Sequence, residues 1–232
     1  MIKTLKKIKY FFEGKYISVN INKISKQWFG NQYGGFYLAQ NSIDKSSIFY
    51  SIGIGEDISF DEGIMDRYGC KVFAFDPTPK SVVWVKENVT TQNFVFSPIG
   101  VAKEKGSRKF YLPTNNNHVS GSIHDIKTIN NSNSIDLKFD SLSNIMKDNN
   151  HSKLDLLKMD IEGAEYEVID HIQKNNIDIK QILVEFHPHF EKDGKKKTKK
   201  AIEKLEKMGY SCFGLSESLL EYSFIKQRVL CI

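Results

Sequence analysis

The chain has 232 residues, of which 40% are hydrophobic and 26% charged, with only five prolines. These proportions are typical of a globular domain and exclude intrinsic disorder as the main state of the chain. The three cysteines, Cys70, Cys212 and Cys231, are far apart and form no CxxC pair. This spacing argues against a zinc ribbon or a dithiol redox motif and indicates a reducing, cytoplasmic location.

The net charge of +5 arises mainly from two groups of lysines, one before residue 10 and one around residue 196. Runs of this kind are usually solvated helix faces, and no aromatic residues alternate with them as in a nucleic-acid groove. No stretch approaches the roughly 18 apolar residues of a membrane span. The apolar run at 10–12 ends at Glu13, which argues against a signal peptide and leaves only a weak peripheral membrane contact open.

The order of the predicted elements indicates one α/β domain over 46–232, preceded by an N-terminal cap over 1–45. From residue 48, short β-rich runs alternate with helical patterns, as in parallel βαβ units. We expect strands at 48–52, 71–75, 93–96, 154–159 and 181–186, and helices at 58–68, 79–89, 142–148, 164–174 and 195–208. Nearly continuous apolar strands are typical of a sheet with helices on both faces. The segments 210–215 and 221–226 are predicted to form an antiparallel pair at one edge.

The segment 105–134 interrupts this alternation. It is rich in asparagine, and we expect mostly loop there, with a short strand at 108–112. An insertion of this length within a compact domain is typical of a functional lid.

A glycine turn follows the first predicted strand. Gly53 and Gly55 allow a sharp turn and close approach of a ligand to the backbone. The second strand ends 21 residues after Gly55 at Asp76, followed by Pro77 and Thr78. An acidic residue there accepts the hydroxyls of a ribose whose other end lies over the glycine turn. The two segments therefore predict a nucleoside-binding crevice.

The charges at this turn favour one cofactor over another. Glu56 and Asp57 lie where the pyrophosphate of a dinucleotide would lie, and the third glycine of a dinucleotide motif is absent. Carboxylates at this point suit S-adenosylmethionine, which carries a sulfonium and an ammonium group. A nicotinamide-dependent oxidoreductase is the alternative enzyme, and a non-catalytic nucleoside-binding module is the alternative outside catalysis.

Four further polar residues lie at or just beyond the ends of two later strands. The strand at 154–159 leads to Asp160 and Glu162, whereas Glu185 and His187 lie two residues apart on one face of the strand at 181–186. The carboxyl ends of parallel strands meet at one edge of the sheet, so these side chains are expected near the glycine turn. Polar groups on an inner strand are costly unless they are satisfied or used. We expect Asp160, Glu185 and His187 to be catalytic, and Asp160 and Glu162 to contact the cofactor.

Taken in order, the segments resemble the FkbM family of S-adenosylmethionine-dependent methyltransferases. They are WFGNQYGGFYLA, YSIGIGEDISFD, AFDPTPKS, SPIGVA, LLKMDIEGAEYEVI, VEFHPHF and EYSFIK, and they extend from residue 28 to 226. The resemblance implies a class I, Rossmann-like methyltransferase fold, with a seven-stranded, mostly parallel sheet whose last strand is antiparallel. It also implies methyl transfer to an oxygen of a sugar, a glycan or a natural-product intermediate.

The resemblance further implies roles for individual residues. The turn on the methionine side of the cofactor would comprise Ser51, Gly53, Gly55 and Glu56. Asp76 would bind the ribose hydroxyls. The segment 97–101, with Ser97 and Ile99, would flank the adenine.

Activation of the acceptor has two possible routes, because a sugar hydroxyl is a poor nucleophile at neutral pH. The preferred hypothesis makes His187 the general base, assisted by Asp160 or Glu185. The second makes Asp160 and Glu185, with His187 as a further candidate, ligands of a divalent metal such as magnesium. The small-molecule or glycan acceptor is expected between the cap and the 115–133 segment. Trp28, Tyr33 and Phe36 either line that pocket or pack the cap.

Overall fold

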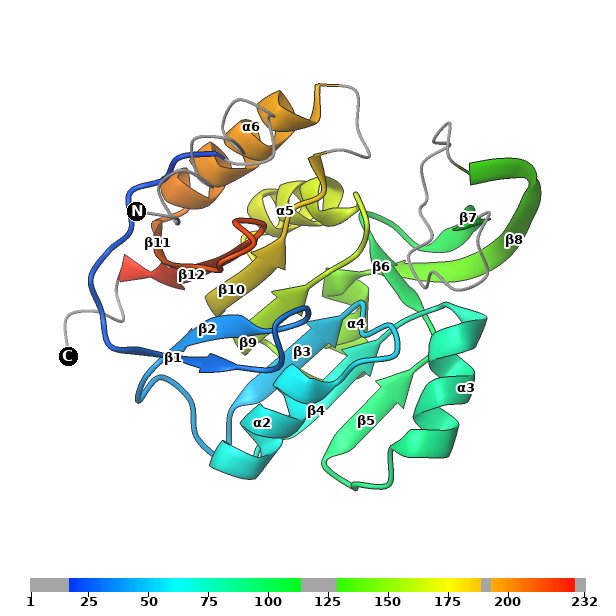
Figure 1. Ribbon diagram of the computed structural model, residues 1–232, viewed down its shortest axis with the longest axis horizontal. Helices are drawn as coiled ribbons and strands as arrows, with labels where there is room; N and C mark the ends of the chain where they lie inside the picture. Colours follow the sequence, from blue (N-terminus) through cyan, green and yellow to red (C-terminus); the bar gives the residue numbers. More distant parts are fainter. Residues whose placement is uncertain (1–16, 114–128, 189–192, 228–232) are drawn as a thin grey trace.

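The computed structural model describes residues 17–113, 129–188 and 193–227, and its centre is a seven-stranded sheet (Figure 1). The strands lie in the order β11-β12-β10-β9-β3-β4-β5. Their bounds are Ile48–Ile52 for β3, Lys71–Phe75 for β4, Phe94–Ser97 for β5, Leu154–Met159 for β9, Ile179–Glu185 for β10, Tyr210–Leu215 for β11 and Glu221–Lys226 for β12. In this sheet β12 runs in the direction opposite to that of the other six strands. This order confirms the predicted class I methyltransferase fold.

The topology places a binding crevice at the centre of the sheet. From β3 the chain moves outward to β4 and β5, and it later returns to the other side of β3 with β9 and β10. In open α/β sheets, ligands bind outside the carboxyl ends of the strands at such a change of direction. The ends of β3, β4 and β9 are therefore where a site is expected.

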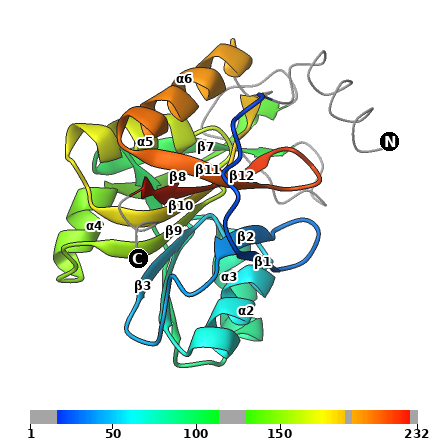
Figure 2. The ribbon, with the colours of Figure 1, turned by 90° about the vertical axis from the view of Figure 1, so that its left-hand side faces the viewer.

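Helices cover both faces of the sheet (Figure 2). They are α2 (Ser59–Tyr68), α3 (Pro79–Asn88), α4 (Leu142–Asp148), α5 (Glu165–Lys174) and α6 (Gly194–Lys207). Local signals define some of their ends: Thr78 caps α3 ahead of Pro79, and Gly69 ends α2 with φ of 67°. The predicted bounds were within two residues of these elements. None of the helices in the described ranges is both long and apolar enough to cross a bilayer.

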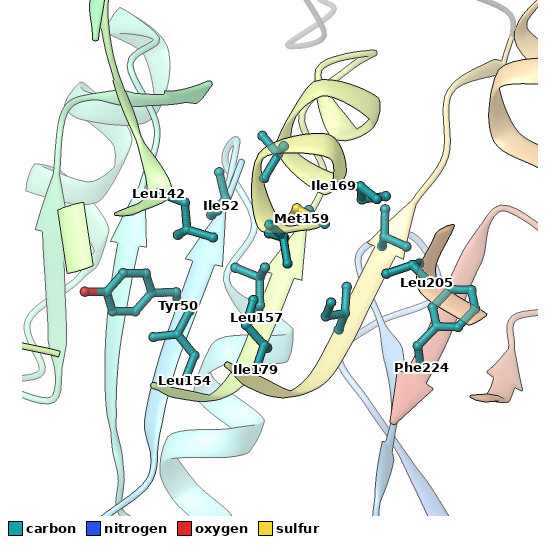
Figure 3. Close-up of a cluster of buried hydrophobic side chains, with 14 of the residues drawn as sticks. Tyr50, Ile52, Leu142, Leu154, Leu157, Met159, Ile169, Ile179, Leu205 and Phe224 are labelled. Atoms are coloured by element: carbon teal, nitrogen blue, oxygen red, sulfur yellow. The ribbon is translucent and has the colours of Figure 1, made fainter. Parts of the chain in front are cut away.

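The core has two main parts, one on each face of the sheet. The first packs α4, α5 and α6 against the sheet, with Leu157, Met159 and Ile169 buried at its centre (Figure 3). The second packs α2 and α3 against the opposite face around Phe49 and Phe60. Strands buried on both faces explain the nearly continuous apolar runs of the sequence.

The segment preceding β3 forms an antiparallel hairpin of β1 (Lys26–Phe29) and β2 (Phe36–Ala39). Phe36 packs edge-on against Phe60 of α2, with ring centroids 5.7 Å apart. The buried side chain of Gln181 on β10 accepts a hydrogen bond of 3.1 Å from the Ala39 amide. The hairpin therefore shares the core of the second face.

The predicted loop character of the 105–134 insertion is wrong in part. The strands β6 (Gly100–Ala102), β7 (Gly106–Pro113) and β8 (Ile129–Ser141) form a separate three-stranded sheet in the order β6-β8-β7. The asparagines at 130, 131 and 133 thus belong to a strand, whereas those at 115–117 lie outside the described residues. The physical reason is the alternation of apolar and polar side chains along β8, which places Leu137 and Phe139 on one face, where they pack with Phe110. Burial of these side chains outweighs the weak preference of asparagine for strands.

Candidate active site

A cavity of about 510 Å³ lies at the carboxyl ends of β3, β4 and β9. Nine of the twelve residues predicted to contact the cofactor line it. They are Gly53, Gly55, Glu56 and Asp57 from the glycine turn, Asp76, Pro77 and Thr78 after β4, and Asp160 and Glu162 after β9. The structure thus brings three segments from different parts of the chain to one cavity.

The other three predicted cofactor residues do not line the cavity. Ser51 is fully buried beneath the turn, since its side chain points to the side of the strand that α2 covers. Ser97 ends β5, and Ile99 packs against the core of the first face. In the segment 97–101 it is Gly100 and Val101 that reach the cavity.

Asp76 holds the glycine turn in place through all of its acceptor sites. Its Oδ2 accepts hydrogen bonds from the amides of Ile54 (3.1 Å) and Gly55 (3.0 Å). Its Oδ1 accepts from the amide (2.9 Å) and the hydroxyl (2.7 Å) of Thr78. Asp76 thus joins the ends of β3 and β4, and its predicted contact with a ribose requires that the hydroxyls share these oxygens.

The N-terminal hairpin closes one side of the cavity. The Asn31 side chain donates a 2.6 Å hydrogen bond to Oδ2 of Asp57, and the Asn31 amide donates to the Ser59 hydroxyl at 3.0 Å. Tyr33, which is 86% exposed, and Gly34 line the cavity from this loop. Of the three aromatic residues proposed for the acceptor pocket, only Tyr33 lines this cavity, whereas Trp28 packs on Tyr37 and Phe36 lies in the core.

Another part of the wall comes from the small sheet, in the insertion that the sequence predicts to act as a lid, although no residue of these strands was predicted to line the site. Phe110 of β7 and Phe139 of β8 line the cavity. Gly100 permits this arrangement, because a Cβ at that position would overlap the Phe139 ring. The alternating pattern of β8 is the signal that points to these aromatic residues.

The three residues predicted to be catalytic meet beside the cavity. Asp160, Glu185 and His187 each present one potential ligand atom, and these atoms lie within 4.8 Å of one another. The Nε2 atom of His187 is 3.6 Å from Asp160 Oδ1, 3.6 Å from Glu185 Oε1 and 3.3 Å from Glu162 Oε2. Since Asp160 and Glu162 also line the cavity, the cluster of Asp160, Glu162, Glu185 and His187 adjoins the cavity directly. We name it the catalytic cluster after the role predicted for three of its members.

Glu165 orients the imidazole, a role that the sequence did not reveal. Its side chain is fully buried and lies 2.7 Å from Nδ1 of His187. The same carboxylate accepts hydrogen bonds from the amides of Ile161 (3.3 Å) and Gly163 (3.0 Å). When Nδ1 donates a hydrogen bond to Glu165, the orientation of the ring is fixed and Nε2 faces the carboxylates of Asp160, Glu162 and Glu185. Glu165 thus holds both the ring and the loop that carries Glu162.

The crowding of carboxylates controls the protons of the cluster. Burial opposes the charging of His187, but Glu165, Glu162 and Asp160 outweigh it and raise the pKa of His187 well above its usual value. Burial, followed by the charge of Asp160, raises the pKa of Glu185 to about 9. Both shifts favour the protonated forms of His187 and Glu185.

These shifts predict that the protein loses stability as the pH rises. His187 and Glu185 bind protons more tightly in the folded protein than in the unfolded chain. The stabilisation from this binding is therefore fully present at a pH below the unfolded pKa values, and it is lost as the pH rises to the folded pKa values. For Glu185 this range extends from about 4.5 to about 9, and for His187 it begins near 6.5. For each proton that only the folded state holds, the free energy of unfolding falls by about 1.4 kcal/mol with every unit by which the pH rises.

Urea unfolding at pH 6, 7, 8 and 9 in the presence of EDTA measures this dependence. Glu185→Gln is the matched variant, because an amide of the same shape does not titrate. We expect a shallower decline in this variant than in the unchanged chain. Parallel curves for the two proteins would contradict the assignment.

Comparison with known proteins identifies similar solved structures and curated relatives. The chain is similar to a crystal structure of methyltransferase FkbM from Methylobacillus flagellatus KT, with 10% identity, 79% of this chain and 44% of that chain covered, and a TM-score of 0.49. It is also similar to a Methanococcus jannaschii fibrillarin pre-rRNA processing protein, with 13% identity and a TM-score of 0.45. This match covers 84% of this chain and 71% of that chain.

Curated relatives include the probable methyltransferase-like protein 24 of Homo sapiens, 26% identical over 67% of this chain, and that of Rattus norvegicus, 25% identical over the same share. The chain spans little more than a third of these relatives, 36% and 37% of their lengths. The family model of the methyltransferase FkbM domain matches residues 47–212, well over half of the chain and including the glycine turn, Asp76 and the catalytic cluster. The chain therefore belongs to the FkbM methyltransferase family.

Proposed function

We propose that this protein transfers a methyl group from S-adenosylmethionine to a hydroxyl oxygen of a sugar, a glycan or another hydroxyl-rich small molecule. The observation that carries the proposal is the junction of two sites. A cavity with a glycine turn and Asp76 adjoins the catalytic cluster through Asp160 and Glu162. Membership of a methyltransferase family supports the reaction class.

The lining of the cavity supports the choice of cofactor. Five carboxylates line it, those of Glu56, Asp57, Asp76, Asp160 and Glu162. This negative lining suits a sulfonium and an ammonium group and repels the pyrophosphate of a nicotinamide dinucleotide. A non-catalytic nucleoside-binding module would have no use for the cluster around His187. These features favour the methyltransferase over both alternatives.

In the proposed reaction, the acceptor oxygen displaces sulfur at the methyl carbon. The new O–CH₃ bond forms as the S–CH₃ bond breaks, its electron pair stays on sulfur, and neutral S-adenosylhomocysteine leaves. The hydroxyl proton goes to the catalytic cluster. Asp160 is placed to accept it, because its carboxylate both lines the cavity and faces His187.

The raised pKa of His187 changes the choice between the two routes of activation. Because a raised pKa favours the imidazole that already carries both protons and is no base, we infer that Asp160 is the base, with His187 as its charged partner. In the alternative form, Asp160, Glu185 and His187 would hold a divalent cation in place of the protons, and the cation would supply Lewis-acid polarisation of the acceptor oxygen. Chelation of metals distinguishes the two forms.

Thermal unfolding with ligands tests the cofactor. At about 100 times its dissociation constant, a ligand adds about 2.7 kcal/mol of stability, or on the order of 5–10 °C for a chain of this size. We expect S-adenosylmethionine and S-adenosylhomocysteine to raise the melting temperature by this amount and NAD to leave it unchanged. A shift with NAD, or none with the two methionine cofactors, would contradict the proposal.

Two variants localise the binding. The Asp76→Asn side chain keeps one acceptor oxygen, but its NH₂ group faces backbone amides that now donate hydrogen bonds to Asp76. We expect this variant to lose most of the ligand-induced rise in melting temperature. Asp66→Asn removes the same charge from an exposed position of α2, and we expect it to keep the shift. Equal shifts in both variants would exclude Asp76 from the cofactor site.

A further inference from the structure

A buried lysine lies at the glycine turn. Lys158 on β9 is only 3% exposed, yet it lines the cofactor cavity. Its Nζ donates a 3.2 Å hydrogen bond to the carbonyl oxygen of Gly53 and lies 6.0 Å from the centre of the Phe36 ring. Among the described residues that line the cavity, Lys158 is the single basic one, against five carboxylates.

Lys158 has no hydrogen-bonded carboxylate partner in the described part of the chain. The acidic residue that acts on it from the core side is Asp61 of α2, fully buried. Burial raises the pKa of Asp61, although Lys158 opposes this. Neither carboxylate oxygen of Asp61 has a hydrogen-bond partner among the described residues. Asp61 therefore does not serve as a strong counter-ion.

An ammonium group has three donors, and the structure describes one hydrogen bond for Lys158, to Gly53. Keeping a charge away from water is costly unless an opposite charge or further hydrogen bonds compensate it. The core side of Lys158 offers apolar rings and Asp61, whose pKa burial raises, whereas its other side faces the cavity. An anionic group of a ligand in the cavity would supply the compensating partner on that side.

We infer that Lys158 binds the α-carboxylate at the methionine end of S-adenosylmethionine. The inference rests on the proposed function. The methionine end carries a carboxylate beside its ammonium group, and Lys158 lies at Gly53, in the turn assigned to that end. The carboxylates of the turn attract the ammonium and sulfonium groups, and Lys158 provides the opposite charge for the carboxylate. Lys158 thereby selects cofactors that retain the amino-acid carboxylate.

Calorimetric titration with two ligands tests this selection. One is S-adenosylmethionine, and the other is its decarboxylated form, which keeps the sulfonium, the amino group and the adenosine. We expect the unchanged protein to bind S-adenosylmethionine about 10- to 100-fold more tightly than the decarboxylated form, as for a hydrogen bond between charged groups. We expect Lys158→Met to bind the two with nearly equal affinity, through weaker binding of S-adenosylmethionine alone.

Two further variants separate binding from folding. Lys153→Met removes a lysine from the exposed segment before β9, and it should keep the full preference for S-adenosylmethionine. Lys158→Met combined with Asp61→Asn removes both buried ionisable groups, so that the fold is kept even if Asp61 depends on Lys158. The double variant should still lack the preference.

The outcomes distinguish this inference from the proposed function. If the unchanged protein binds both ligands equally well, or if Lys158→Met weakens both to the same extent, the inference is overturned and the methyltransferase proposal stands. Recovery of the preference in the double variant would likewise overturn it, since Lys158 would then act only through Asp61. If the unchanged protein binds neither ligand, the proposed function itself fails.

Discussion

Replacing His187 with asparagine is expected to lower the rate of methyl transfer by about 10²- to 10⁴-fold and to leave the fold intact. Asparagine retains a side-chain amide that can donate to Glu165 but lacks the Nε2 atom, which lies 3.3 Å from Glu162 and 3.6 Å from Asp160. Without the Nε2 atom, Asp160 as the proton acceptor loses the charged imidazole beside it. In the metal-bound form the cation loses a ligand.

His187→Ala serves as the comparison, because it also deprives the fully buried Glu165 of its partner. Leaving one partner of a buried ion pair alone costs about 3–5 kcal/mol, so this variant should lose stability as well as activity. His171→Asn changes an imidazole on α5 that contacts Ser143, and it should retain the full rate. The three variants thus separate the chemistry at Nε2 from the structural contact at Nδ1.

The measurement is incorporation of labelled methyl groups into a panel of sugars and glycans, with and without EDTA and with added Mg²⁺. Activity that survives exhaustive chelation assigns proton removal to Asp160. Activity that EDTA abolishes and Mg²⁺ restores assigns it to a cation at Asp160, Glu185 and His187. A His187→Asn protein that binds the cofactor and turns over at the full rate would remove His187 from the mechanism.

The second large effect is expected at Gly53. Gly53→Ala should lower the free energy of unfolding by about 3 kcal/mol or more, because two costs coincide. Gly53 has φ of 75°, a conformation that costs other residues about 1–2 kcal/mol. Its new Cβ would also overlap the main-chain carbonyl oxygen of Asp160, and such overpacking costs about 1–3 kcal/mol. A main-chain atom at the end of an inner strand has little freedom to move away.

Gly209→Ala is the matched control. Gly209 has φ of 85°, but a Cβ added to it would have no heavy atom of the described residues within 4 Å, apart from its chain neighbours. The substitution should cost only the conformational part, about 1–2 kcal/mol. Urea unfolding of the two variants measures the difference, which reports the close contact between the glycine turn and the segment after β9. Equal losses of stability would mean that this contact relaxes freely.

Much of the fold could be predicted from the sequence because its signals are local. A strand buried on both faces appears as a short apolar run, and β3, β4 and β9 lie at their predicted residues. The polar residues that interrupt such runs, Asp76 and Asp160, indicate the carboxyl edge of the sheet. Parallel strands bring those ends together, so that the cavity and the catalytic cluster follow from chain order alone.

The tertiary structure decided which partners these residues have. Glu165 and His187 are 22 residues apart, and their contact depends on how α5 packs beside β10. Lys158 lies within an apolar strand, and only the position of Gly53 and Asp61 around it reveals a buried charge facing a cavity. The wall formed by Phe110 and Phe139 depends on the pairing of β7 with β8. Local sequence determines which face of a strand a side chain occupies, but its partner and its charge state depend on packing between segments distant in the chain.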